Sequence, residues 1–224
     1  MRTYKPLLTL LLTTVTTAPA ATFSSFGAFN AAIAGQSASA ETFGELAPGQ
    51  AIPVGATIGR FAVSSYNLTQ GATQGIVDDV DNSLSGQSLG ADHTGLAPSL
   101  IYFFAGEGFT LTFSQPINSV GILFNVSLLA TGSFRVSAAG QTATTLASAY
   151  DPAFPNGGTF VFAGLTSATS FRTATITGSD SYNVPEILTS SAVPEPAAVL
   201  PVSFALLVFA GVVLRRRAGQ PKLI

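Results

Sequence analysis

The chain carries few residues that could do chemistry. His93, which follows Asp92, is its only histidine, and there is no cysteine. A Ser-His-Asp triad needs three groups that converge in space, and no nucleophile elbow presents a serine here. We therefore expect His93 to be an exposed loop residue. A single histidine without cysteine also argues against a zinc site, and the lack of cysteine excludes disulfides and a thiol nucleophile.

The densest acidic cluster is the segment 78–83, DDVDNS. Carboxylate oxygens are ligands that Ca²⁺ prefers. The segment is not an EF-hand loop, because Leu84 stands where that loop needs glycine and Gly90 stands where it needs glutamate. A solvated acidic loop and a calcium site of another geometry both stay open, and no other cofactor is expected. The candidate calcium ligands are Asp78, Asp79 and Asp81.

Glycoside hydrolysis would need two carboxylates at a fixed separation in a cleft. Nothing in the sequence pairs the candidates, so we do not expect an enzyme, and a secreted hydrolase is our third hypothesis. Glu107 stands between Gly106 and Gly108, which predicts a turn, and Glu186 is expected to end a strand. The candidates are Glu41, Glu45, Glu107, Asp151 and Glu186.

Aromatic rings can bind sugars by stacking on their faces. The chain has no tryptophan, so tyrosines would have to do this, and Tyr150 and Tyr182 lie near Asp151 and Asp180 in expected loops. A shallow glycan site and a set of tyrosines at the rim of a core both remain open. The tyrosines concerned are Tyr66, Tyr102, Tyr150 and Tyr182.

Charge excludes one class of partner. Residues 21–193 contain three arginines, no lysine and ten carboxylates, which gives this middle part a net charge of −7. Such a domain repels the phosphates of DNA and RNA, so we expect no nucleic-acid binding.

The middle part begins with a short helical pattern. Phe26, Phe29 and Ile33 recur at helical spacing after two serines that could cap the helix, and Gly35 would end it. The next segment, residues 41–43, is expected to begin a strand.

Strand patterns dominate the rest of the body. Residues 67–98 are expected to be mostly loop with weak strands, and Pro116 is expected to end the strand that begins at Phe109. Strands recur between Gly-rich turns, and no long helical pattern intervenes. This predicts an all-β body over residues 22–188, a β-sandwich of jelly-roll-like form. The later strands are predicted at 120–126, 134–137, 141–146, 159–163 and 171–177.

The first residues read as a secretory signal over 1–20. Arg2 and Lys5 are followed by an apolar, leucine-rich core. Ala18 and Ala20 supply small residues at the positions that signal peptidase reads. We expect cleavage after Ala20.

The other end of the chain reads as a membrane anchor. Residues 197–214 are uncharged and eighteen in number, close to the roughly 20 that a transmembrane helix needs. The basic tail 215–224 would stay in the cytoplasm and leave the body outside. In the linker 189–196, two prolines bias the chain to an extended form just before the span.

These C-terminal features together resemble the PEP-CTERM sorting family. The motif consists of Pro194, Glu195 and Pro196, then the apolar span, then Arg215, Arg216 and Arg217. The resemblance implies cleavage near the motif by an exosortase and delivery to the cell surface or to an exopolysaccharide matrix. A plain membrane anchor is the alternative. The leading hypothesis is thus a non-enzymatic surface or matrix protein, and the second is a lectin-like glycan-binding module, with or without calcium.

Overall fold

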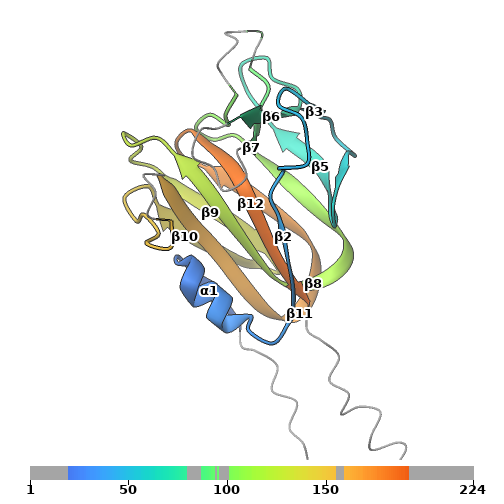
Figure 1. The fold of residues 1–224 in the computed structure, drawn as a ribbon, viewed down its shortest axis with the longest axis vertical. Helices are drawn as coiled ribbons and strands as arrows, with labels where there is room; N and C mark the ends of the chain where they lie inside the picture. Colours follow the sequence, from blue (N-terminus) through green and yellow to red (C-terminus); the bar gives the residue numbers. More distant parts are fainter. Residues whose placement is uncertain (1–19, 80–86, 94, 96–100, 155–158, 192–224) are drawn as a thin grey trace, which may run out of the picture. The chain divides into compact units, whose positions relative to one another are not determined.

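The computed structural model describes residues 20–191 except 80–86, 94, 96–100 and 155–158. Within them the fold is mostly β, with one large antiparallel sheet and one short helix (Figure 1). The sorting motif, the apolar segment and the basic tail lie outside the described residues, as does nearly all of the secretory signal. A helix long and apolar enough to cross a membrane does not occur in the described part.

The sheet has one main path of eight strands and four strands that join it from the side. The path runs β10-β9-β11-β8-β12-β7-β6-β3, while β1 joins β11, β2 joins β12, β5 joins β8 and β4 joins β5. The elements are β1 (Ala21–Phe23), α1 (Phe26–Ala32), β2 (Ser37–Glu41), β3 (Ala51–Ile52), β4 (Thr57–Ile58), β5 (Phe61–Asn67), β6 (Gly75–Asp79), β7 (Gln87–Ala91), β8 (Gly108–Val126), β9 (Ser133–Ala138), β10 (Gln141–Leu146), β11 (Phe160–Gly178) and β12 (Tyr182–Ser191).

Two strands of nineteen residues, β8 and β11, organise this sheet. They pair with each other near both ends. On its other side, each of the two strands pairs with one strand along its first half and with a different strand along its second half. The first half of β8 lies beside β5 and its second half beside β12. Pro116 therefore does not end a strand, contrary to the prediction. Pro116 is exposed and lies between the part of β8 that pairs with β5 and the part that pairs with β12. The N–H that proline lacks is therefore not required for pairing with either strand, and the proline is tolerated there.

The main core lies on the inner side of the sheet. Alternate residues of the strands point into it, as the period of two requires. Its central rings are Phe103, Phe109 and Tyr182, and neighbouring rings in this stack are 5.1 Å apart. Full burial of each such side chain contributes about 2–3 kcal/mol to folding. The core is thus built from aromatic rings contributed by strands far apart in the sequence.

Helix α1 packs against the opposite side of β8 and β11 and forms a second apolar cluster (Figure 1). Phe29 is its buried centre and contacts the ring of Phe162. Gly121 and Gly164 are paired across the strands, and a Cβ at either would come within 2.7 Å of a ring carbon of Phe162 or Phe29. The two glycines leave the space that lets α1 approach the sheet. The helix itself was predicted correctly.

The cap of α1 differs from the prediction. Ser25 occupies the N-cap position, but its side chain makes no capping hydrogen bond. The backbone N–H of Phe26 donates instead to a carboxylate oxygen of Asp151, which lies in the loop between β10 and β11. A serine would have been a sufficient local cap, so this contact over 125 residues ties the helix to the far part of the chain.

Two other strand boundaries were wrong. Glu41 ends β2 rather than beginning a strand. Glu186 lies inside β12 rather than at its end, because β12 continues past Pro185 through a bulge that places one extra residue opposite β8. A bulge is one of the few places where a sheet accepts proline.

Candidate functional site

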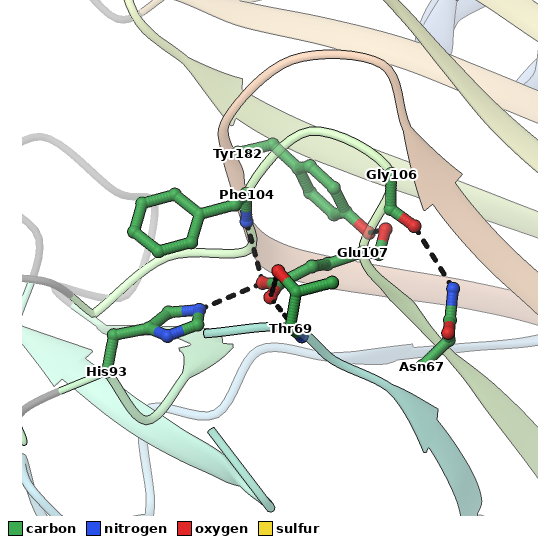
Figure 2. Close-up of polar contacts among 7 residues, drawn as sticks. All are labelled: Asn67, Thr69, His93, Phe104, Gly106, Glu107 and Tyr182. Atoms are coloured by element: carbon green, nitrogen blue, oxygen red, sulfur yellow. Dashed lines mark hydrogen bonds and ion pairs between the residues drawn. The ribbon is translucent and has the colours of Figure 1, made fainter. Parts of the chain in front are cut away.

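The chain's only histidine and one of its glutamates meet in the interior. His93 Nε2 lies 2.9 Å from Glu107 Oε2, and both side chains are fully buried (Figure 2). His93 follows β7, and Glu107 lies in the turn just before β8. Two segments that the sequence left as separate loops therefore share one buried ionic contact.

Glu107 is surrounded by hydrogen-bond donors. Its Oε1 accepts from the backbone N–H of Thr69 at 2.6 Å and from the Thr69 hydroxyl at 2.7 Å. Its Oε2 accepts from the N–H of Phe104 at 2.8 Å and from His93. A carboxylate has about four acceptor positions, and all are used here. The group is thus a junction that fastens three segments together (Figure 2).

The backbone around Glu107 explains how its side chain becomes buried. Gly106 has a φ of +83°, which closes the turn, and its carbonyl accepts from Asn67 Nδ2 at 3.1 Å. A Cβ at Gly108 would lie 2.0 Å from the carbonyl oxygen of Ile176, so only glycine lets β8 begin there. The Tyr182 hydroxyl donates to the Glu107 carbonyl at 3.1 Å.

The hydrogen bonds also fix the protonation state of the site. Burial raises the pKa of Glu107, but the hydrogen bonds from Thr69, Phe104 and His93 outweigh it and hold the pKa of this carboxyl below its usual range. An ionised carboxylate only accepts, so His93 Nε2 must carry a proton. The stabilisation from this carboxylate is present above the unfolded pKa of about 4 and is lost as pH falls through the lower folded pKa.

The other ring nitrogen of His93, Nδ1, is buried and has no hydrogen-bond partner among the described residues. The ring packs on Phe104, with 4.1 Å between the ring centres. The carboxylate of Asp92 bonds to Gln74 instead, at 3.3 Å. Nothing in the described part of the chain therefore places a nucleophile on this histidine, and the pair has the arrangement of a structural contact.

The expectation of an exposed His93 was wrong, and the prediction of a turn at Glu107 gave no sign that its side chain is buried. His93 is 1% exposed and Glu107 is 0% exposed. The turn itself exists, since the Glu107 N–H donates to the Phe104 carbonyl. The one available signal was the glycine on each side of Glu107, which suits a close approach of backbones as well as a turn.

The other candidate carboxylates are spread over the fold. Asp151 is buried and accepts from the N–H groups of Phe26 and Ala153. Burial raises the pKa of Glu186 in β12. Burial and the nearby charge of Glu45 raise the pKa of Glu41. Glu107 and Asp151 are thus both held as hydrogen-bond acceptors.

The acidic cluster is only partly described. Asp78 and Asp79 form the end of β6, and Asp78 accepts from Asn183 Nδ2 at 3.1 Å. Asp81 lies outside the described residues. The described part of the chain contains no group of three or more histidine and acidic side chains that could hold a metal ion.

Some of the candidate tyrosines are held in contacts within the protein, and others are accessible to solvent. Tyr182 begins β12 and is 1% exposed, so it cannot stack on a sugar, and the expectation that it lies in a loop was wrong. The Tyr66 hydroxyl donates to the Ile52 carbonyl at 2.7 Å. Tyr102 packs edge-on against Phe104, while Tyr150 is 44% exposed. Tyr66 and Tyr182 thus belong to the rim and interior of the core.

The residues predicted for processing lie at the two ends. Ala20 is the first described residue, and Ala18 precedes the described part. The sorting motif, Pro194 to Pro196, and the basic cluster, Arg215 to Arg217, also lie outside it. These positions therefore remain predictions from the sequence.

Comparisons with known proteins find only distant similarity. The chain matches no protein-family model and no curated protein. Among solved structures it is similar to the catalytic unit of the thermostable GH87 α-1,3-glucanase from Streptomyces thermodiastaticus, with 12% identity, a TM-score of 0.38, and coverage of 71% of this chain and 27% of that one. It is also similar to the insecticidal crystal protein Cry2Aa, with 13% identity, a TM-score of 0.36, and coverage of 58% and 20%. The chain thus spans less than a third of the length of either structure.

Proposed function

We propose that this protein is exported as a precursor held in the inner membrane and is then released by an exosortase that cuts near Pro194 to Pro196. Its β body would act as a structural component of the cell surface or matrix. One observation carries this proposal: the Pro-Glu-Pro motif, the uncharged span and the arginine cluster follow one another behind a secretory signal. A plain anchor needs the span and the arginines but not the proline strip.

The way the body ends supports release at this point. Strand β12 is paired with β8 on one side and with β2 on the other, and its last residue, Ser191, is in register with Ser37. A cut near Pro194 would remove no hydrogen bond of this ladder. The released body would therefore keep its fold.

The state of the buried carboxylates supports a non-enzymatic role. Glu107 accepts four hydrogen bonds and Asp151 accepts two. A general acid or base has to be within reach of a substrate proton. Both groups instead bind the protein's own backbone, which favours a structural domain over a hydrolase. The lectin-like alternative is weakened, because Tyr182 is buried and the Tyr66 hydroxyl is bonded to the Ile52 carbonyl, so neither ring is offered to a sugar.

We also propose that the body is a β-sandwich of jelly-roll-like form. The neighbours of β8 change along its length, and those of β11 do as well, which lets one hydrogen-bonded sheet bend over its own core. A sandwich of this kind would present broad outer faces and place its loops at two ends, as suits a scaffold protein.

The sorting proposal is tested by replacing Pro194, Glu195 and Pro196 together with alanine. The protein should then remain in the inner membrane fraction with its C-terminal segment attached. The control is Pro53→Ala, which changes an exposed proline of the body and should be delivered like the wild type. Surface delivery of the triple variant would refute the proposal.

A further inference from the structure

One outward face of the sheet is covered with hydroxyl groups, and we call it the hydroxyl face. It is formed by β5, β9, β10, the first half of β8 and the second half of β11. One row crosses all five strands in register, because each residue pairs with the next across the ladder. The row consists of Ser65, Thr110, Thr175, Ser137 and Thr142.

These hydroxyls are ordered by one another. The Thr110 and Thr175 hydroxyls are 3.2 Å apart, and those of Ser137 and Thr142 are 2.8 Å apart. Each hydroxyl can donate once and accept twice, so the contact within a pair leaves positions for an outside partner. Threonine is also stiff at χ1, which lowers the entropy lost on binding. The row is a preformed hydrogen-bonding surface at the solvent-exposed side of the sheet.

The positive charges of the body are concentrated at this face. Its three arginines are Arg60, directly before β5, Arg135 in β9 and Arg172 in β11, and all are exposed. The five strands of the face contain no aspartate or glutamate, although the body carries ten acids. None of the three arginines forms an ion pair with the residues that the structure describes. Their charges are therefore available to a ligand.

The arginines mark the two ends of the face. Arg172 donates to the Ser114 carbonyl at 2.8 Å, and Ser114 bonds to the carbonyl of Arg60 on its other side. Two strand spacings thus separate Arg60 from Arg172, roughly 10 Å. Arg135 pairs with Thr177, five positions along β11 from Arg172, or roughly 17 Å. Hydroxyl groups fill the area between these charges.

We propose that the hydroxyl face is a docking surface for an acidic polysaccharide. A chain of sugars with a carboxylate on some of them would place anions on the arginines and hydroxyls on the serine and threonine rows. The acidic remainder of the body would repel such a chain and so restrict it to this face. The distance between the arginines requires an oligomer of several sugars.

Two other occupants fit less well. A second copy of the chain in a two-fold contact would bring the same arginines toward each other, and the five strands of the face carry no carboxylate to pair with them. Duplex DNA carries a charge every 1.7 Å or so, far denser than three arginines spread over this area. Binding of a polysaccharide goes beyond the sorting proposal and does not depend on it. A correctly sorted protein that failed to bind would overturn the docking proposal alone.

The test measures binding of the full chain, extracted in a neutral detergent, to immobilised polygalacturonate, with neutral dextran and duplex DNA as comparison ligands. We expect binding to polygalacturonate that weakens about 20-fold between 50 and 200 mM salt, as for about three charge contacts with a single-stranded polyanion. Binding to dextran and DNA should be at least tenfold weaker. Absence of binding to polygalacturonate, or equal binding to DNA, would overturn the proposal.

Variants assign the binding to this face. Arg135→Gln with Arg172→Gln should weaken polygalacturonate binding at least tenfold. The double variant Arg135→Lys with Arg172→Lys keeps both charges and should retain most of the binding. Thr22→Val changes an exposed threonine of β1, outside this face, and should leave binding unchanged. The unfolding temperature of each variant is measured to check that its fold is kept. If the double Gln variant is folded and binds like the wild type, the face is not the docking surface.

Discussion

Strands β8 and β11 present two different outward surfaces along their length. Near Gly121 and Gly164 the outer side is apolar and is covered by α1, with Phe29 at the centre of the contact. Near Thr110 and Thr175 the outer side carries hydroxyls and is open to solvent. The same backbone pairing supports both. The difference separates a surface that stabilises the fold from one that is available for recognition.

The largest effect is expected from the covered surface. Phe29→Ala should lower the free energy of unfolding by about 3–5 kcal/mol, because it removes a fully buried ring and leaves a cavity between α1 and the sheet. Urea unfolding measures this change. The control Leu129→Ala alters a side chain that is 89% exposed and should cost less than about 0.5 kcal/mol. Equal costs for the two variants would mean that α1 does not pack on the sheet as described.

The buried junction should give the next effect. Glu107→Gln replaces one accepting oxygen by an NH₂ group that faces donors, and should cost about 1–3 kcal/mol at pH 7. The difference from the wild type should shrink below about pH 4, where protonation removes the ionised carboxylate that the folded state favours.

A second buried glutamate supplies the matched control for this junction. Burial raises the pKa of Glu186, so at pH 7 its ionised form opposes folding, and Glu186→Gln should be neutral or stabilising. The contribution of Glu186 becomes more favourable as pH falls through its raised pKa, opposite in sign to that of Glu107. Loss of stability in both variants at pH 7 would contradict these assignments.

The cap of α1 should contribute less. Asp151→Ala leaves the Phe26 N–H without its acceptor and should cost about 1–2 kcal/mol in thermal or urea unfolding. Ser25→Ala should cost close to nothing, because the Ser25 side chain makes no capping bond. The reverse order of the two variants would show that the helix is capped locally, as its sequence suggests.

The open surface should tolerate change. Thr110→Val combined with Thr175→Val should alter the free energy of unfolding by about 0.5 kcal/mol or less, because both residues are β-branched and neither is fully buried. The same variant should lose binding to polygalacturonate. A large loss of stability would mean that the hydroxyl face is part of the folding core, and the contrast between the two surfaces would fail.

Local patterns in the sequence predicted much of this fold. The helix and the strands β9 and β10 follow from spacing alone, since each is set by its own residues. The length of β8 and β11 did not follow. Pro116 and the break in alternation near Phe171 resemble strand ends, but they are irregularities within long strands whose neighbours change.

The candidate site could not be predicted in the same way. His93 and Glu107 are polar residues in Gly-rich segments, and only the pairing of distant strands brings them together in the core. The role of Asp151 likewise depends on a contact with Phe26 across most of the body. Long-range contacts of this kind leave no local pattern. The gathering of the arginines at the hydroxyl face could be predicted only with the strand order known, although the arginines themselves are visible in the sequence.

The most direct test of the proposed function is the intact mass of the protein recovered from the cells that make it, together with the fraction in which it is found. The proposal predicts a chain that begins at Ala21, ends near Pro194 to Pro196 and lies outside the inner membrane. A chain that retains residues 197–224 and stays in the inner membrane would contradict it and would identify a plain anchored protein.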